Sequence, residues 1–271
     1  MVPFRQVPSE QFNGEAKIVK KSQFDPANYW EKRLSTNPNI RGTGHRAFSQ
    51  EYNHWIYRSQ RDCLSTLIQK NNISFDGKNI LDIGSGYGYY IEYFLEKSPL
   101  SISGVDITDT SINFLKQKFP SLSFYKLDIS GPITVFNNKF DFISAISVMI
   151  HIVDDDRFVI AVKNLCNLLS SEGYLLLSDS YQKSFLPHVK HVKMRDKSIY
   201  ESLFTGFDIE ILEILPVHYL IDKFTLPMLP GLLEFFKLYR WFYRIDTKLR
   251  QSGANNGSGM KMLLARHKLQ P

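Results

Sequence analysis

The 271-residue chain is long enough for one α/β domain with additions and short for two full domains. Its 43% hydrophobic and 22% charged residues are typical of a globular protein. The net charge is +6 and the basic residues are scattered along the sequence, which indicates only weak attraction to anionic partners. The lone cysteines Cys63 and Cys166 exclude a disulfide framework, and the sequence shows neither an apolar signal core nor a membrane-length apolar run, so we expect a cytoplasmic protein.

The N-terminal quarter divides into two predicted parts. Residues 1–24 are polar and lysine-rich with single apolar anchors, and we expect them to be flexible. Residues 25–72 are predicted to form a helical cap. Asp25 before Pro26 is typical of a helix start, and residues 49–71 carry apolar side chains at steps of three and four.

The next segment combines a strand, a glycine-rich turn and a helix. Residues 79–83 form an apolar run typical of a buried parallel strand, and helical spacing begins at residues 91–95. Between them the sequence reads Gly84-Ser85-Gly86-Tyr87-Gly88. Glycines let a ligand approach the backbone closely, and the first N–H groups of the helix lack internal partners. The pattern therefore predicts a cofactor-binding turn.

The spacing of this turn bears on which cofactor it binds. A dinucleotide fingerprint needs Gly or Ala at Tyr89, whereas the third glycine here is Gly88. Asp82 would repel a pyrophosphate but attract a cation. S-adenosyl-L-methionine carries a sulfonium and an ammonium, so it fits better than NAD. An NAD-dependent oxidoreductase stays an alternative.

Two further carboxylates follow strand-like runs. Asp106, with Ile107 after it, lies about twenty residues beyond the turn, a distance at which an acid reaches ribose hydroxyls. Asp128 and Ile129 end the next run. Asp128 is suited to accept a hydrogen bond from an adenine amino group, with the two isoleucines on either side of the ring. All these acids are expected at the carboxyl edge of a parallel sheet, where such sheets bind ligands.

The ordered set of motifs is more specific than any one of them. It consists of LDIGSGYG (81–88), GVDI (104–107), KLDI (126–129) and FDFISAISVMIH (140–151). This set resembles the class I S-adenosylmethionine-dependent methyltransferases over roughly residues 78–180. The resemblance implies a Rossmann-like, seven-stranded, doubly wound α/β sheet across residues 73–271, closed by an antiparallel strand. It implies a cofactor held by Asp82, Gly84, Ser85, Gly86, Gly88, Asp106, Ile107, Asp128 and Ile129.

The predicted cap holds three further candidates. In small-molecule members of the family, a Tyr-Trp pair in the cap lies near the methionine end of the cofactor, and Tyr29, Trp30 and Arg33 match that pattern. On this hypothesis Tyr29 and Arg33 bind the cofactor. The alternative is that the aromatic residues only pack the cap on the sheet and that Arg33 is solvated.

A catalytic candidate follows the predicted fourth strand. His151 comes shortly after the strand tip, and its imidazole has the intrinsic pKa of a general base. The alternative is a histidine that only hydrogen-bonds within its loop, because methyl transfer needs little acid or base. The acids 154–156 are interpreted as a helix cap, and His188 and His191 lack partners at metal-ligand spacing, so we expect no metal site.

An insertion of residues 216–257 precedes the predicted last strand. Its predicted helix, residues 232–249, is apolar over most of its circumference with one basic stripe. Three alternatives remain open for this helix: a lid over the substrate, a homodimer surface and a peripheral membrane contact.

The predicted function is methyl transfer from S-adenosyl-L-methionine to oxygen or carbon of a small or lipid-like organic acceptor by in-line displacement. The Asp/Asn-Pro-Pro-Tyr/Phe tetrapeptide of DNA amino-group methylation is absent after the fourth strand, which argues against DNA as a partner. A noncatalytic adenosylmethionine-binding subunit is the second alternative.

Overall fold

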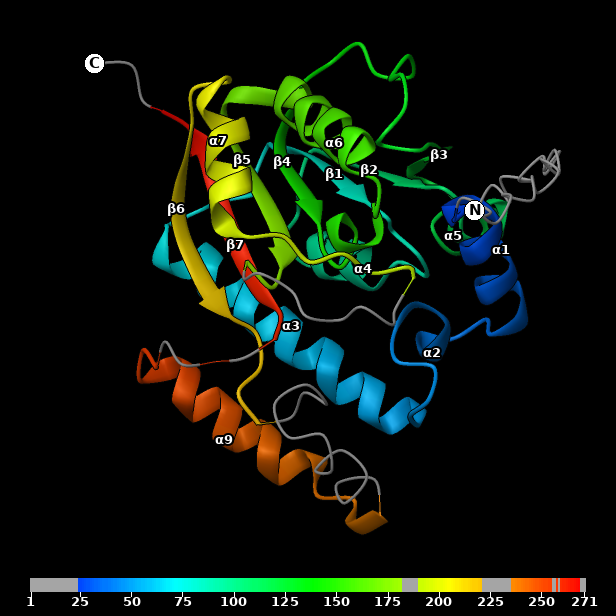
Figure 1. The fold of residues 1–271 in the computed structure, drawn as a ribbon, viewed down its shortest axis with the longest axis vertical. Coiled ribbons are helices and arrows are strands. Elements are labelled where there is room, and N and C mark those ends of the chain that lie inside the picture. The colour runs from blue at the N-terminus through cyan, green and yellow to red at the C-terminus, as the bar shows by residue number, and fades with distance from the viewer. Residues whose placement is uncertain (1–23, 182–189, 221–234, 255–256, 258, 269–271) are drawn as a thin grey trace, which may run out of the picture.

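The computed structural model describes residues 24–181, 190–220, 235–254, 257 and 259–268. The segment predicted to be flexible, residues 1–24, lies outside the described residues except for Phe24. Figure 1 shows a central sheet flanked by helices, with the N-terminal helices at one edge.

The sheet has seven strands in the order β3-β2-β1-β4-β5-β7-β6. Their bounds are β1 Asn79–Ile83, β2 Ser101–Asp106, β3 Ser123–Lys126, β4 Phe140–Ala145, β5 Leu169–Asp179, β6 Ile209–Pro216 and β7 Lys261–His267. The pairs from β3 to β5 are parallel, and β7 runs antiparallel to both β5 and β6. This arrangement confirms the predicted doubly wound sheet with an antiparallel closing strand.

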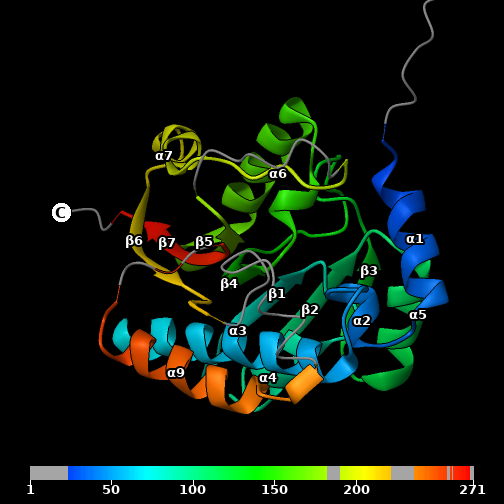
Figure 2. The ribbon, with the colours of Figure 1, turned by 60° about the horizontal axis from the view of Figure 1, so that its bottom comes forward.

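Helices cover both faces of the sheet, which is why its central strands are apolar along their length. In Figure 2, α6 and α7 lie on one side, and α3 and α4 lie on the other. The helices are α1 Pro26–Thr36, α2 Ile40–Thr43, α3 Gln50–Lys70, α4 Tyr89–Leu95, α5 Asp109–Lys118, α6 Asp155–Leu168, α7 Lys197–Thr205 and α9 Tyr239–Gln251, with a 3₁₀ turn η1 at Met149–His151.

Side-chain caps start α1 and α6 where the sequence indicated. Asp25 accepts from the N–H of Asn28 at α1, and Asp154 accepts from the N–H of Arg157 at α6. Residues 171–173 lie inside β5, although they include a glycine of the kind that often ends a helix. The chain is already extended at Leu169, with φ −74° and ψ 136°, because this residue pairs with Phe140 of β4.

The cap is joined to the sheet domain through the start of α5. The carboxylate of Glu31 in α1 accepts a hydrogen bond from the N–H of Asp109 at 2.8 Å and bonds the hydroxyl of Thr110. A carboxylate from the cap thus satisfies free amides in the first turn of α5, where negative charge is favoured.

The predicted helix 232–249 differs in extent from the helix observed. Its first residues, up to 234, lie outside the described residues. The helical path is interrupted at Lys237, whose φ is +53°, so α9 begins at Tyr239 and continues to Gln251. Within the described part of the chain, no helix is long and apolar enough to cross a bilayer.

Candidate active site

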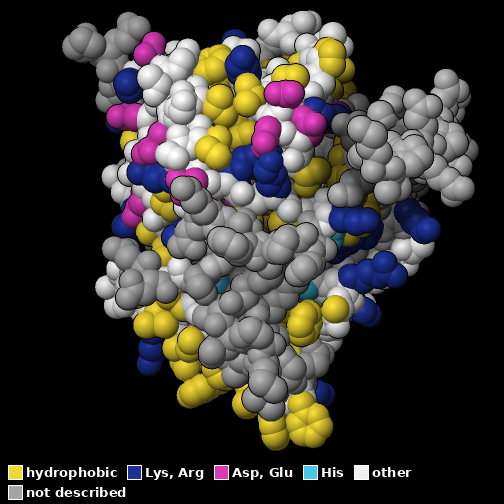
Figure 3. Space-filling model, in the orientation of Figure 1, with side chains coloured by type: hydrophobic (Ala, Val, Ile, Leu, Met, Phe, Trp, Pro, Cys, Tyr) yellow, Lys and Arg dark blue, Asp and Glu magenta, His cyan; other side chains and the backbone are white. Residues whose placement is uncertain are grey.

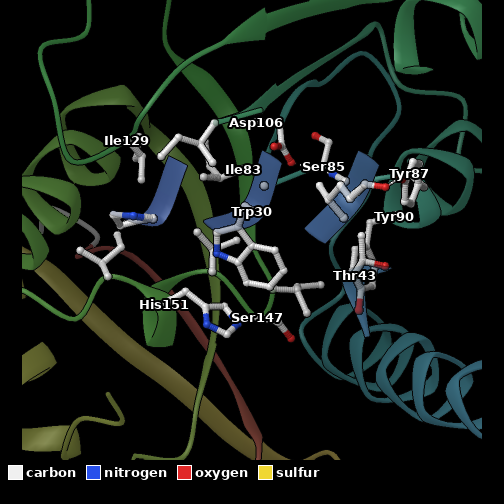
Figure 4. A pocket seen from close by; sticks show the side chains of 18 of the residues that line it. Trp30, Thr43, Ile83, Ser85, Tyr87, Tyr90, Asp106, Ile129, Ser147 and His151 are labelled. Atoms are coloured by element: carbon white, nitrogen blue, oxygen red, sulfur yellow. Dashed lines mark hydrogen bonds between the residues drawn. The ribbon is translucent and has the colours of Figure 1, made fainter. Parts of the chain in front are cut away.

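A cavity of ≈ 510 Å³ lies at the carboxyl edge of β1, β2 and β4, under the cap. The glycine turn and the ends of the three strands form its floor, while α1 and α2 contribute apolar side chains from above (Figure 4). Its position agrees with the edge at which open parallel sheets bind ligands.

The glycine turn is wedged between the cap and α5. Gly84, Gly86 and Gly88 all have positive φ, at +69°, +52° and +81°. A Cβ on Gly86 would lie 2.7 Å from the methyl of Thr43 in the cap, and one on Gly88 would lie 2.6 Å from Phe119. The third glycine therefore serves close packing against the segment that ends α5, which explains its position.

Asp106 ties the turn to the end of β2. One carboxylate oxygen accepts the N–H of Gly86 at 3.0 Å, and the other accepts the N–H and hydroxyl of Thr108 at 3.0 and 2.7 Å. Burial raises the pKa of Asp106, and these hydrogen bonds oppose that rise. Asp106 and Ile107 both line the cavity, where the predicted ribose contact would be made.

Asp82 lies beneath the turn, outside the lining of the cavity. It is buried, and Ser144 donates to its Oδ1 at 2.6 Å, while its Oδ2 has no hydrogen-bond partner within the described structure. Burial raises the pKa of Asp82 to about 7, with the negative charge of Asp106 adding to the rise. A buried carboxylate with a free oxygen below the turn is suited to a cationic ligand.

Asp128 and Ile129 lie on the cavity wall, but the carboxylate of Asp128 has a partner that the sequence did not indicate. Arg157 of α6 forms an ion pair with its Oδ2, and the N–H of Ser130 donates to its Oδ1 at 2.9 Å. The predicted contact with an adenine amino group would be made by a carboxylate already held in place by this arginine.

The cap candidates separate into a wall residue and two supporting residues. Trp30 lines the cavity, whereas Tyr29 and Arg33 do not. The guanidinium of Arg33 donates to the carbonyl of Gly42 at 2.7 Å, to the Tyr29 hydroxyl at 3.1 Å and to the carbonyl of Gly44. These bonds hold α2 and its C-terminal cap against α1, so the geometry favours a structural role for this pair.

His151 faces the cavity from η1, after the tip of β4 (Figure 4). Its Nδ1 lies 2.8 Å from the carbonyl oxygen of His191, so Nδ1 carries the proton and Nε2 is a bare acceptor. The Trp30 ring meets it edge-on at 4.8 Å. Burial lowers the pKa of His151 to about 4. The imidazole is therefore neutral near pH 7 and can accept a proton.

The sequence did not indicate several residues of the cavity wall. Thr43 and Tyr57 come from the cap, Tyr87 comes from the turn itself, and Arg157 comes from α6. Their approach to the cavity depends on contacts between segments far apart in the chain, and only the apolar spacing of α3 hinted at Tyr57. Among the described residues, no group of histidines, cysteines and acids has the arrangement of a metal site.

A family of known proteins matches the middle part of the chain. The family described as "Methyltransferase domain" matches residues 80–173, from β1 into β5. Residues 80–173 are therefore similar to a methyltransferase domain. The free oxygen of Asp82 and the tight glycine turn fit S-adenosylmethionine as the cofactor.

Similar proteins of known name cover only part of the chain. A tRNA U34 carboxymethyltransferase from Nautilia profundicola is 29% identical over 136 residues, 48% of this chain and 44% of that protein. The ubiquinone/menaquinone biosynthesis C-methyltransferase UbiE from Campylobacter jejuni is 26% identical over 145 residues, 46% of this chain and 60% of that protein. The chain thus matches about half the length of these relatives.

Solved structures support the fold of the methyltransferase domain and its flanking elements. Magnesium protoporphyrin IX methyltransferase from Synechocystis with bound S-adenosylmethionine superposes with a TM-score of 0.59 at 12% identity, over 91% of this chain and 99% of that one. A S-adenosylmethionine-dependent methyltransferase from Clostridium acetobutylicum gives 0.57 at 16% identity, over 87% and 99%.

The raised pKa of Asp82 predicts that cofactor binding depends on pH. A cationic ligand favours the ionised carboxylate, so binding near pH 7 should release a proton, and affinity should fall by up to about tenfold for each pH unit below 7. Without ligand, the raised pKa stabilises the fold at low pH, and this contribution is lost as pH rises through about 7.

Calorimetry with S-adenosylmethionine, which carries the sulfonium charge, from about pH 5.5 to about 7.5 in buffers of different ionisation enthalpy, checks this prediction. Asp82→Asn should bind more weakly and lose the pH dependence, whereas Asp76→Asn, at an exposed site, should behave as the unaltered protein. An equal pH dependence in the Asp82 variant would contradict the assignment.

Proposed function

We propose that this protein transfers a methyl group from S-adenosyl-L-methionine to oxygen or carbon of a small organic acceptor with a large apolar surface. The observation that carries the proposal is that one cavity joins the glycine turn and Asp106 to the Trp30 and His151 wall. The cofactor-binding side and an apolar wall bearing a neutral base therefore share one space.

The proposed mechanism divides the cavity into two parts. When bound, S-adenosylmethionine supplies an electrophilic methyl group on a sulfonium. Asp106 and the turn would hold the nucleoside, with Asp128 at the adenine end and Asp82 supplying negative charge below the turn. Trp30 and the other apolar cap residues exclude water and orient the acceptor.

His151 is the candidate that would receive the acceptor's proton. Its Nδ1–H is held by the carbonyl of His191, which leaves Nε2 free for a hydroxyl or an acidic carbon. This role is needed only where the acceptor carries a proton that must leave. The C-methyltransferase relative supports carbon as one target, and the apolar cavity wall supports a lipid-like acceptor.

The proposal is tested by incubating the protein with methyl-labelled S-adenosylmethionine and separate lipid, small-metabolite, RNA and protein fractions of its source cells. We expect label in a lipid or small-molecule product. Label confined to RNA or protein would refute the proposed acceptor class. Cofactor binding without label in any fraction would favour the noncatalytic subunit, and tight binding of NAD in place of S-adenosylhomocysteine would revive the oxidoreductase alternative.

A further inference from the structure

Helix α9 is anchored to the outer side of α3, away from the cavity. Tyr239 is buried against Tyr52 with ring centroids 5.7 Å apart, and Tyr243 packs on Trp55 at 5.0 Å. Buried Asp246 accepts from the N–H groups of residues 219 and 220, at 3.1 and 2.8 Å. No described residue of the insertion 216–257 lines the cavity, so α9 is not its lid.

The outward side of this segment is unusually apolar. Phe235 is 79% exposed, Phe236 59%, Trp241 58% and Leu238 43%. Figure 3 shows apolar side chains gathered along the lower edge of the molecule, the edge where α9 lies in Figure 1. Large aromatic side chains lose favourable free energy when they are left in water, so this surface needs a partner.

A row of basic side chains lies beside these exposed apolar side chains. Lys237, Arg240, Arg244 and Lys248 are all exposed, and none forms an ion pair with another described residue. Asp246 is the one acid between residues 235 and 251, and it is buried. The exposed face therefore combines free positive charge with aromatic side chains, as in helices that lie in the interface of an anionic bilayer.

The surface is connected to the cavity through a neighbouring depression. This open depression on α3 shares His54 and Tyr89 with the cavity wall, and it is also lined by Trp55, the residue that packs on α9. In Figure 2 the start of α9 lies beside α3 near the cap. Docking through this end would place the depression close to the docked membrane.

We propose that residues 235–248 dock this protein on the surface of an anionic lipid membrane, with the aromatic side chains inserted at the level of the headgroups. The basic residues bind lipid phosphates, and α9 lies parallel to the surface on its α3 support. This inference goes beyond the proposed function and does not depend on it, because membrane docking requires neither cofactor nor methyl transfer.

A membrane fits this surface better than a second copy of the chain does. A two-fold dimer built on this face would bring the same four basic residues of both copies into one interface, because a two-fold interface uses the same patch twice. Four uncompensated cations on each side would repel one another. Anionic lipid instead offers charge complementarity together with an apolar layer for the exposed rings.

The test is co-sedimentation of the full chain with vesicles of phosphatidylcholine, with and without phosphatidylglycerol, at low and high salt. We expect binding to the anionic vesicles that weakens with salt and little binding to pure phosphatidylcholine. Arg240→Gln with Arg244→Gln should weaken binding about fivefold for each charge removed. Trp241→Ser should weaken it further, because the inserted ring is lost.

Matched controls separate this surface from general charge and hydrophobicity. Lys116→Gln with Lys163→Gln removes two exposed charges elsewhere, and Leu100→Ser removes an exposed apolar side chain. Both controls should bind as the unaltered protein, and circular dichroism should show every variant folded. Equal losses in controls and test variants, or no salt-sensitive binding, would overturn the proposal. So would a dimer in solution that Trp241→Ser dissociates.

Discussion

Replacing Gly86 by alanine is expected to weaken binding of S-adenosylhomocysteine by about 10- to 100-fold. The new Cβ would lie 2.7 Å from the Thr43 methyl, at a φ of +52° that costs an alanine roughly 1–2 kcal/mol. Moving the turn away would also break the bond from the Gly86 N–H to Asp106, a type worth about 1.5–3 kcal/mol. Isothermal titration measures the affinity.

Two further variants distinguish the steric effect from backbone strain. Gly77 also has positive φ, at +68°, but a Cβ there meets nothing within 4 Å. Gly77→Ala should therefore lower the melting temperature less than Gly86→Ala does, because it adds backbone strain without a clash, and it should leave affinity unchanged. Thr43→Ser removes the opposing methyl, so the double variant with Gly86→Ala should recover part of the binding. Unchanged affinity in Gly86→Ala alone would show that the turn does not hold the cofactor.

Replacing His151 by alanine is expected to lower kcat by about 10²- to 10⁴-fold for an acceptor that must lose a proton, with cofactor affinity little changed. Because the pKa of His151 is lowered to about 4, the base is already neutral at pH 5 and above. At saturating cofactor, the unaltered protein's rate should therefore fall as pH falls through about 4, and not through 6.5. A labelled-methyl assay over this pH range measures both effects.

The control for proton transfer keeps the hydrogen bond and removes the base. His151→Asn retains an N–H donor toward the carbonyl of His191 but has no basic nitrogen, so it should be nearly as impaired as the alanine variant. His54→Ala changes another cavity histidine and should retain most of the activity. Full activity in His151→Asn would assign the residue to positioning alone.

The sheet and the floor of the cavity were predictable because their signals are local. Strand-like runs of apolar residues made Asp82, Asp106 and Asp128 assignable to strand ends from the sequence, although Asp128 follows the partly exposed edge strand β3 by two residues. The glycine spacing likewise required a tight turn at a known place.

The walls were less predictable because they depend on contacts between distant segments. Nothing in the sequence near Asp128 indicates its ion pair with Arg157. Nothing near Arg33 indicates that its guanidinium would donate hydrogen bonds to the carbonyls of residues 42 and 44. Helix α9 shows a similar limit. Its apolar composition suggested a lid, yet Asp246 is buried and Trp241 is exposed, because the packing of α9 on α3 determines which side faces inward.

The bond between Glu31 and the first turn of α5 has a consequence for how ligands enter. Lifting α1 to admit a ligand would take the acceptor away from the Asp109 amide and leave the start of α5 uncapped. Separation of α1 from α5 and fraying of α5 would then occur together. The hydrogen-exchange rate of the Asp109 amide would therefore report how often α1 moves away.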